Sequence, residues 1–137
     1  MKVRFFTEED YPIIKAWWEG HNLVAIPFNV LPGLGWIVSD GDKDIGAGWM
    51  DTSAFGVMCY FYGYLSNPEA TPFQSDEGYD TALAGMVDFA TSENYSIMLA
   101  MPYQRSLKIK AKQNGFIVNH DSVAQMIKIL RKKEAVA

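Results

Sequence analysis

Ser96-Ile97-Met98-Leu99-Ala100-Met101 is an unbroken, mostly apolar run, short enough to predict a buried strand. The residues that follow, Pro102 to Ser106, predict a turn. Leu107 to Gln113 predicts a basic helix, and Asn114-Gly115-Phe116 ends it, because glycine readily takes the left-handed conformation that closes a helix. From Ser122 to Leu130 apolar residues recur in an alternating pattern, which predicts a final strand.

The residues before this unit predict a series of strands joined by short turns. The clearest turn signal is Asp40-Gly41-Asp42-Lys43, because Asp-Gly favours the tight turns of β-hairpins. Thr7 precedes three acids and can cap the first amides of a helix that Gly20 ends. The expected elements are, in chain order, a strand at Val3–Phe6, a helix at Thr7–Gly20, an irregular segment at His21–Leu34, strands at Gly35–Ser39, Asp44–Thr52 and Phe55–Leu65, and a helix at Asp76–Asn94.

This order of elements predicts the architecture. Hairpin-linked strands followed by strand-helix-strand connections indicate an α/β (α+β) fold with a mixed, mostly antiparallel central sheet and helices on both faces. The segment Phe55–Leu65 is bulky on both of its alternating faces, so we expect it in the interior of the sheet. A chain of 137 residues fits one domain, residues 1–137.

Composition excludes several classes of protein. Apolar residues make up 49% of the chain and aromatic residues 14%, which predicts a packed core. The net charge of −4 implies no general affinity for nucleic acid or for an anionic membrane. No segment has the length of a membrane span or the pattern of a signal peptide, so a cytoplasmic location is expected. The single cysteine, Cys59, lies among apolar residues and predicts a buried, reduced thiol, and the two histidines make no metal site.

The strand, the helix closed by Gly115-Phe116 and the final strand resemble the closing unit of the GCN5-related N-acetyltransferases, and the order of elements resembles that family over nearly the whole chain. The resemblance implies an acetyltransferase-like fold, with acetyl-CoA as acyl donor and an amine as acceptor. In that family the strand matching Phe55–Leu65 splays from the next strand, and the gap holds the pantetheine arm of acetyl-CoA. The backbone of Tyr64, Leu65 and Ser66 would then hydrogen-bond this arm.

Alternation along Phe55–Leu65 divides its side chains between two faces. The first set is Met58, Tyr60, Tyr62 and Tyr64, and the second is Val57, Cys59, Phe61 and Leu65. The tyrosine row has two interpretations: phenols that reach backbone or water at the edge of a layer, or a polar row that faces a substrate cleft. Many family members carry a glutamate base in this strand, which has no carboxylate here. Tyr62 lies near that position, and its phenol, with an ordinary pKa of ~10, could donate a proton or hold a water, so Tyr62 is the expected catalytic residue.

The family also carries Gln/Arg-x-x-Gly-x-Gly/Ala at a helix start, where backbone amides and the helix dipole hold a pyrophosphate. This chain has Gln74-Ser75-Asp76-Glu77-Gly78-Tyr79-Asp80, with the glycine one position out of place. The resemblance implies that Gly78 and Tyr79 contact the cofactor. The three acids of this stretch are expected in the first turn of the helix, where they would repel a phosphate. The alternative is an ordinary self-capped helix.

Two residues of the last unit are also implied in cofactor binding. Counted back from Gly115-Phe116, Gln104 falls where many members carry an asparagine that contacts the cofactor arm, and its amide can make the same kind of contact. Ser106 falls where members often carry a small residue. Ala111 falls where many carry a tyrosine that protonates the departing thiolate, which alanine cannot do.

Two functions of different classes therefore remain open. In the first, the protein moves an acetyl group from acetyl-CoA to the amine of a small molecule or protein, relying on proximity and on water for deprotonation. In the second, it is a catalytically degenerate domain of this fold that acts through protein–protein interaction. The aromatic segment Glu19–Leu34 suits an apolar acceptor, a protein surface or a lid, and its His21 is interpreted as a surface or capping residue.

Overall fold

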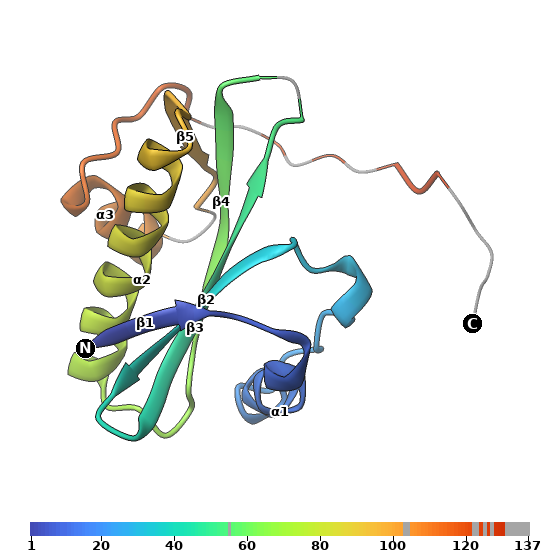
Figure 1. The fold of residues 1–137 in the computed structure, drawn as a ribbon, viewed down its shortest axis with the longest axis vertical. Coiled ribbons are helices and arrows are strands. Elements are labelled where there is room, and N and C mark those ends of the chain that lie inside the picture. The colour runs from blue at the N-terminus through green and yellow to red at the C-terminus, as the bar shows by residue number, and fades with distance from the viewer. Residues whose placement is uncertain (55, 103–104, 122–123, 125, 127, 131–137) are drawn as a thin grey trace. The chain divides into compact units, whose positions relative to one another are not determined.

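The computed structural model describes residues 1–54, 56–102, 105–121, 124, 126 and 128–130 (Figure 1). The chain divides into two compact units, Met1–Tyr103 and Gln104–Ala137, and each is described on its own. The first unit holds the whole sheet, helix α1 (Tyr11–Gly20) and helix α2 (Pro72–Ser92). The second holds helix α3 (Arg105–Gln113). That residues 1–137 form one domain stays a prediction.

The sheet has five strands in the order β1-β2-β3-β4-β5. Their bounds are β1 Lys2–Phe5, β2 Leu34–Asp40, β3 Lys43–Thr52, β4 Met58–Ser66 and β5 Ile97–Ala100. The pairs from β1 to β4 are antiparallel, and β5 runs parallel to β4, which confirms the predicted mixed sheet. Strand β4 is interior, as predicted, and begins at Met58; Phe55 lies outside the described residues.

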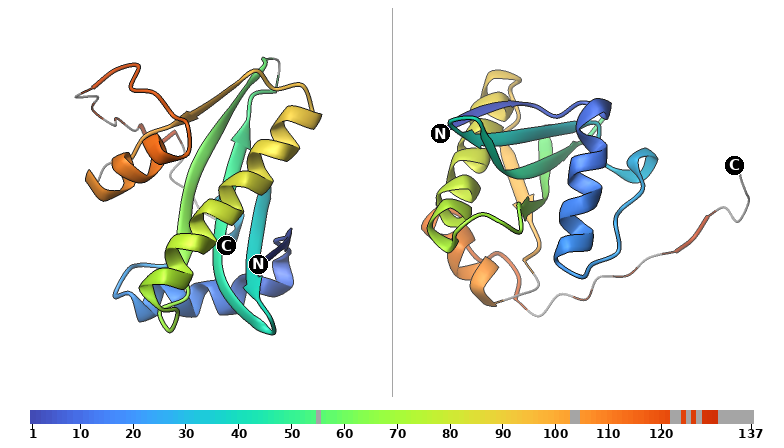
Figure 2. Two further views of the ribbon diagram at one scale, coloured as in Figure 1. Left: turned by 90° about the vertical axis from the view of Figure 1, so that its left-hand side faces the viewer. Right: turned by 90° about the horizontal axis from the view of Figure 1, so that it is seen from below.

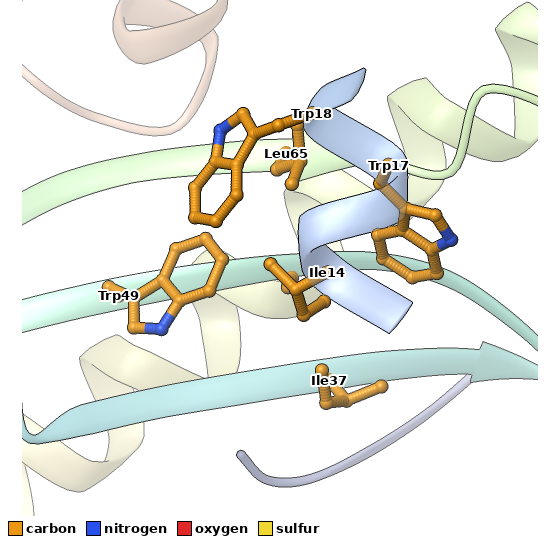
Figure 3. Close-up of a cluster of buried hydrophobic side chains, with 7 residues drawn as sticks. Ile14, Trp17, Trp18, Ile37, Trp49 and Leu65 are labelled. Carbon is orange, nitrogen blue, oxygen red and sulfur yellow. The ribbon is translucent and has the colours of Figure 1, made fainter. Parts of the chain in front are cut away.

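Helix α1 covers one face of the sheet (Figure 3). Its apolar residues Ile14, Trp17 and Trp18 recur at helical spacing and are buried. They pack against side chains from three strands, namely Ile37, Ala47, Trp49 and Leu65. The indoles of Trp18 and Trp49 stack with ring centroids 5.6 Å apart, and this joins α1 to β3.

Helix α2 covers the opposite face, so helices lie on both faces as predicted (Figure 2). Phe89 of α2 packs edge-on against Trp36 of β2, with ring centroids 5.6 Å apart. Gly48 of β3 leaves the space that Met86 fills, because a Cβ at Gly48 would overlap the Met86 methyl group. Cys59 of β4 is buried, which confirms the predicted buried thiol, and its Sγ lies 3.6 Å from the carbonyl oxygen of Ile97.

Helix α2 begins earlier than predicted. Asp76 was expected at its start, but the N-cap is Thr71 and Pro72 is the first helical residue. The hydroxyl of Thr71 accepts from the amide of Gln74, and the Gln74 side chain accepts from the amide of Thr71, a reciprocal capping box that fixes the helix start. The first turn of α2 therefore carries no acid, and the expectation that acids crowd it is wrong.

The closing unit matches the prediction in its helix and differs in both of its strands. Strand β5 lies at the edge of the described sheet and none of its residues is buried, with Ile97 54% exposed, so the expectation of a buried strand is wrong. Helix α3 ends as predicted: Gly115 has φ +90°, and the Phe116 amide donates to the Ala111 carbonyl oxygen at 3.1 Å. Within the predicted strand Ser122–Leu130, residues 122, 123, 125 and 127 lie outside the described residues, and the others are not in a strand. Alternating apolar residues form a strand only where a neighbour pairs with them, and no described strand does so here. Among the described residues, no helix combines the length and apolar character needed to cross a membrane.

Candidate functional site

A β-bulge in β4 sets Tyr62 apart from the residues around it. In the β3–β4 register Trp49 lies opposite Gly63 and Met50 lies opposite Phe61, so Tyr62 has no partner on β3. A bulge of this kind bends a strand and redirects the side chain of the extra residue. Tyr62 is 43% exposed. The residue expected to be catalytic thus occupies the one irregular position in this strand pair.

The bulge also breaks the predicted tyrosine row. Phe61 and Tyr64 were assigned to opposite faces by strict alternation, but both pack against Tyr79 of α2, with ring centroids 5.7 Å and 5.5 Å apart. Inserting one residue between them shifts the alternation by one position, because side chains change face at every residue. Tyr64 therefore faces α2 and does not continue the row of Tyr60 and Tyr62.

Beyond the bulge, one edge of β4 is open. Strand β5 pairs with β4 only from Met58 to Phe61. On the other edge the Asn67 amide donates to the Ile45 carbonyl oxygen at 2.7 Å. In an antiparallel pair, every second residue of a strand turns its N–H and C=O groups toward the partner strand, and the residues between them turn these groups away. The N–H and C=O groups of Ser66 and Tyr64 must then point away from β3, past the end of β5. Within Met1–Tyr103 the described residues place no strand against them.

His21 lies at the end of this open edge. Its Nε2 is 2.8 Å from the carbonyl oxygen of Ser66 and 3.3 Å from the Ser66 hydroxyl. A carbonyl oxygen can only accept, so Nε2 is the donor in the shorter contact. His21 is the C-cap residue of α1, which positions it there. The position of His21 at the end of α1 agrees with its interpretation as a capping residue. The sequence analysis did not predict the contact between His21 and Ser66, for which the end of the helix at Gly20 is the one local signal.

Leu65, Gly78 and Tyr79 have structural surroundings. Leu65 is buried in the cluster under α1, and its backbone faces β3 by the same alternation. Tyr79 is buried against Phe61 and Tyr64. Gly78 lies more than one turn inside α2, where a Cβ would overlap the Tyr64 hydroxyl.

The Tyr64 phenol is enclosed by two glycines. A Cβ at Gly46 of β3 would overlap the Tyr64 hydroxyl, as would one at Gly78. The buried hydroxyl finds no hydrogen-bond partner among the described residues. Burial raises the pKa of Tyr64 far above its ordinary value, so this phenol is protonated near neutral pH.

The connection from β4 to α2 uses nearly all of its own backbone amides. Asn67 organises it: its amide donates to Ile45, its side-chain oxygen accepts from the Glu69 amide at 2.9 Å, and its carbonyl oxygen accepts from the Ala70 amide at 2.9 Å. The capping box at Thr71 takes two further amides. Backbone N–H groups that are bonded within the chain cannot also form a cradle for an anion.

The remaining predicted site residues belong to the second unit. Gln104 lies outside the described residues, and Ser106 is an exposed residue of the first turn of α3. Ala111 is on the same helix. No cluster of histidine, cysteine or acidic side chains with the geometry of a metal site occurs among the described residues.

The fold is that of the GCN5-related acetyltransferases. The structure resembles the ribosomal-protein-S18-alanine N-acetyltransferase from Escherichia coli, with a TM-score of 0.67, 10% identity and coverage of 83% of this chain and 76% of that one. It also resembles a GNAT family acetyltransferase from Staphylococcus aureus (TM-score 0.63, 13% identity, 92% and 98% covered). A third similar structure is the aminoglycoside acetyltransferase meta-AAC0020 from an uncultured soil metagenomic sample, in complex with sisomicin (TM-score 0.66, 14% identity, 95% and 96% covered). No protein-family model and no curated protein sequence matches the chain.

Proposed function

We propose that this protein transfers an acetyl group from acetyl-CoA to an amine acceptor. The observation that carries the proposal is the open edge of β4 at Tyr64 and Ser66, next to the bulge at Tyr62. An extended chain of amides can add to a free sheet edge as a further strand does. The pantetheine arm of acetyl-CoA has two amide groups, which would pair with the N–H and C=O of Tyr64 and the N–H of Ser66, since the Ser66 carbonyl oxygen already accepts from His21.

In the proposed reaction the amine nitrogen attacks the thioester carbonyl carbon. A C–N bond forms, the C–S bond breaks, the amine loses a proton and the thiolate gains one. Tyr62 is the proposed proton donor to the thiolate, acting directly or through a water, because its phenol is partly exposed at the bulge. Holding both reactants at one place accounts for much of the expected acceleration, as no carboxylate lies on β4.

The proposed acceptor is an amine on a small molecule or on a protein. Structures of the same fold include an aminoglycoside acetyltransferase and an enzyme named for the alanine of a ribosomal protein. Near α1 the segment between residues 21 and 34 carries an aromatic group, in which Phe28 packs against Phe6 and Tyr11 with ring centroids 6.2 Å and 5.8 Å apart. We propose this segment as the surface that receives the acceptor.

The test is thiol release from acetyl-CoA over a panel of amines. Tyr62→Phe should lower turnover by about 100-fold or more while the affinity for CoA, measured by calorimetry, changes little. Tyr60→Phe is the matched control, because Tyr60 is paired with Asp51 on one side and Leu99 on the other and should keep full turnover. Turnover that Tyr62→Phe leaves intact would remove the role given to Tyr62.

A second candidate, an interaction domain without catalysis, is favoured by the apolar surface of the same segment. Val24 is 92% exposed, Val30 59% and Leu23 56%, which is a high exposure for three apolar residues within eight positions of the chain. This candidate predicts neither thiol release on a broad amine panel nor CoA binding by the wild-type protein. Measurable turnover by the wild type would exclude it.

A further inference from the structure

A phosphate site at the β4–α2 connection would need free backbone amides. The first amides of a helix have no partner within the helix, and they point outward, as in the phosphate sites of many nucleotide-binding proteins. Helix α2 is the next element after β4, and its first residue, Pro72, comes six positions after Ser66. Its first turn is therefore where the nucleotide end of a donor lying along the edge of β4 would meet amides.

Nearly all the amides here are taken or missing. Pro68 and Pro72 have no N–H. Five other backbone amides donate hydrogen bonds within the protein. The donors and their acceptors are Asn67 to Ile45 O at 2.7 Å, Glu69 to Asn67 Oδ1 at 2.9 Å, Ala70 to Asn67 O at 2.9 Å, Thr71 to Gln74 Oε1 at 3.0 Å and Gln74 to Thr71 Oγ1 at 3.1 Å. Within residues 67–74, Phe73 is left as the one residue whose amide has no acceptor in the part of the chain that the structure describes. One amide cannot enclose a phosphate, which in helix-start sites receives several.

The charges around the connection do not replace the missing amides. The Asp40 carboxylate accepts from the Gln74 side-chain amide at 3.3 Å, so a negative group already lies at the start of α2. The Lys43 ammonium group is near, but it donates to the Glu69 carbonyl oxygen at 3.2 Å. A carboxylate and an ammonium group together give a phosphate little net attraction.

Resting on the proposed function, we propose that the acyl donor is recognised through its pantetheine arm and not through its nucleotide. The substrate class is then pantetheine thioesters in general, with acetyl-CoA as one member. The transfer is the same with each donor: the C–N bond forms, the C–S bond breaks, and the proton lost by the amine balances the one gained by the thiolate. What changes is that the leaving thiol can be pantetheine itself.

The experiment compares kcat/KM for acetyl-CoA and S-acetylpantetheine with one amine acceptor. We expect the two values to agree within about threefold, and 3′,5′-ADP not to inhibit, because the nucleotide adds little at a site with one open amide. A kcat/KM for acetyl-CoA more than tenfold higher, or competitive inhibition by 3′,5′-ADP, overturns this inference while leaving the acetyltransferase function standing. Absence of turnover and binding with both donors overturns the proposed function as well.

A gain of nucleotide recognition gives a second readout. Pro72→Ala together with Gln74→Ala restores one amide and frees that of Thr71, while the Thr71 hydroxyl still caps the helix. This variant should lower KM for acetyl-CoA by about fivefold and leave KM for S-acetylpantetheine unchanged. The reason is that contact with the start of a helix raises the affinity for a negatively charged group by about that factor. Pro12→Ala, in the first turn of α1, is the control and should change neither value. An equal effect on both donors would show that the amides of α2 do not meet the nucleotide.

Discussion

The packing of Tyr64 against Gly78 predicts a coupled pair of substitutions. In an open helix position Gly→Ala stabilises by ~1 kcal/mol. At Gly78 the new Cβ would overlap the Tyr64 hydroxyl and lie 3.1 Å from Ile45 Cγ2. Such overpacking costs ~1–3 kcal/mol, so Gly78→Ala should destabilise the protein by ~1 kcal/mol net. The Tyr64 ring cannot easily move to relieve the overlap, because Gly46 packs against the same hydroxyl.

Tyr64→Phe removes the group that causes the overlap. The substitution alone should stabilise by ~1 kcal/mol, because it deletes a buried hydroxyl with no partner among the described residues. In that background the nearest remaining ring atom is 3.6 Å from the Cβ position at Gly78. Gly78→Ala should then be close to neutral, which corresponds to a coupling free energy of ~1–2 kcal/mol between the two positions.

Urea denaturation of the four proteins, followed by far-ultraviolet circular dichroism, measures this cycle. Gly63→Ala is the control, because a Cβ at Gly63 meets nothing within 4 Å, and its effect should be the same in both backgrounds. If Gly78→Ala costs the same free energy with tyrosine and with phenylalanine at position 64, the contact does not limit the packing of α2 on β4 and the reasoning fails.

Two further predictions concern the helix starts. Burial alone would raise the pKa of Asp10, but hydrogen bonds from Arg4 and Thr7 hold this pKa below its ordinary value. The Asp10 carboxylate therefore stabilises the protein above about pH 4, and this stabilisation is lost as the pH falls through the lowered pKa. Asp10→Asn should lower the free energy of unfolding in urea by ~1 kcal/mol at pH 6 and by less at pH 3, and an equal loss at both pH values would contradict this. Thr71→Ala removes the cap of α2 and should cost ~1 kcal/mol in thermal unfolding, whereas Thr81→Ala, whose hydroxyl bonds only within the helix, should cost clearly less; equal costs would refute the capping role.

Local signals predicted the frame of the fold. The hairpin between β2 and β3 follows from Asp40-Gly41, and Gly41 has φ +62°, a conformation that glycine takes without strain. The burial of Ile14, Trp17 and Trp18 follows from helical spacing. These features depend on residues close together in the chain. The start of α2 does as well, because Thr71-Pro72 followed by Gln74 is a capping-box pattern, although the helix was expected only from Asp76.

Long-range pairing decided what the sequence could not predict. The bulge at Tyr62 depends on how β3 pairs with β4, and the alternating pattern of β4 gives no sign of it. The contact of His21 with Ser66 joins residues 45 positions apart. The hydrogen bonds that occupy the backbone amides of the β4–α2 connection depend on Asn67, whose side chain also donates to the Asp44 carbonyl oxygen at 2.9 Å. Such bonds need the folded backbone in place before they can be recognised.

The four tryptophans give the molecule its own optical probes, one set for each face of the sheet. Trp17, Trp18, Trp36 and Trp49 are all buried, so their emission in the native state should lie at short wavelength. Trp18 and Trp49 stack at an interplanar angle of 16°, close enough for their excited states to couple and give a signed pair of dichroic bands. Trp36 packs on the opposite face against Phe89. Loss of the coupled bands would report detachment of α1, and a red shift that persists in a Trp36-only variant would report detachment of α2.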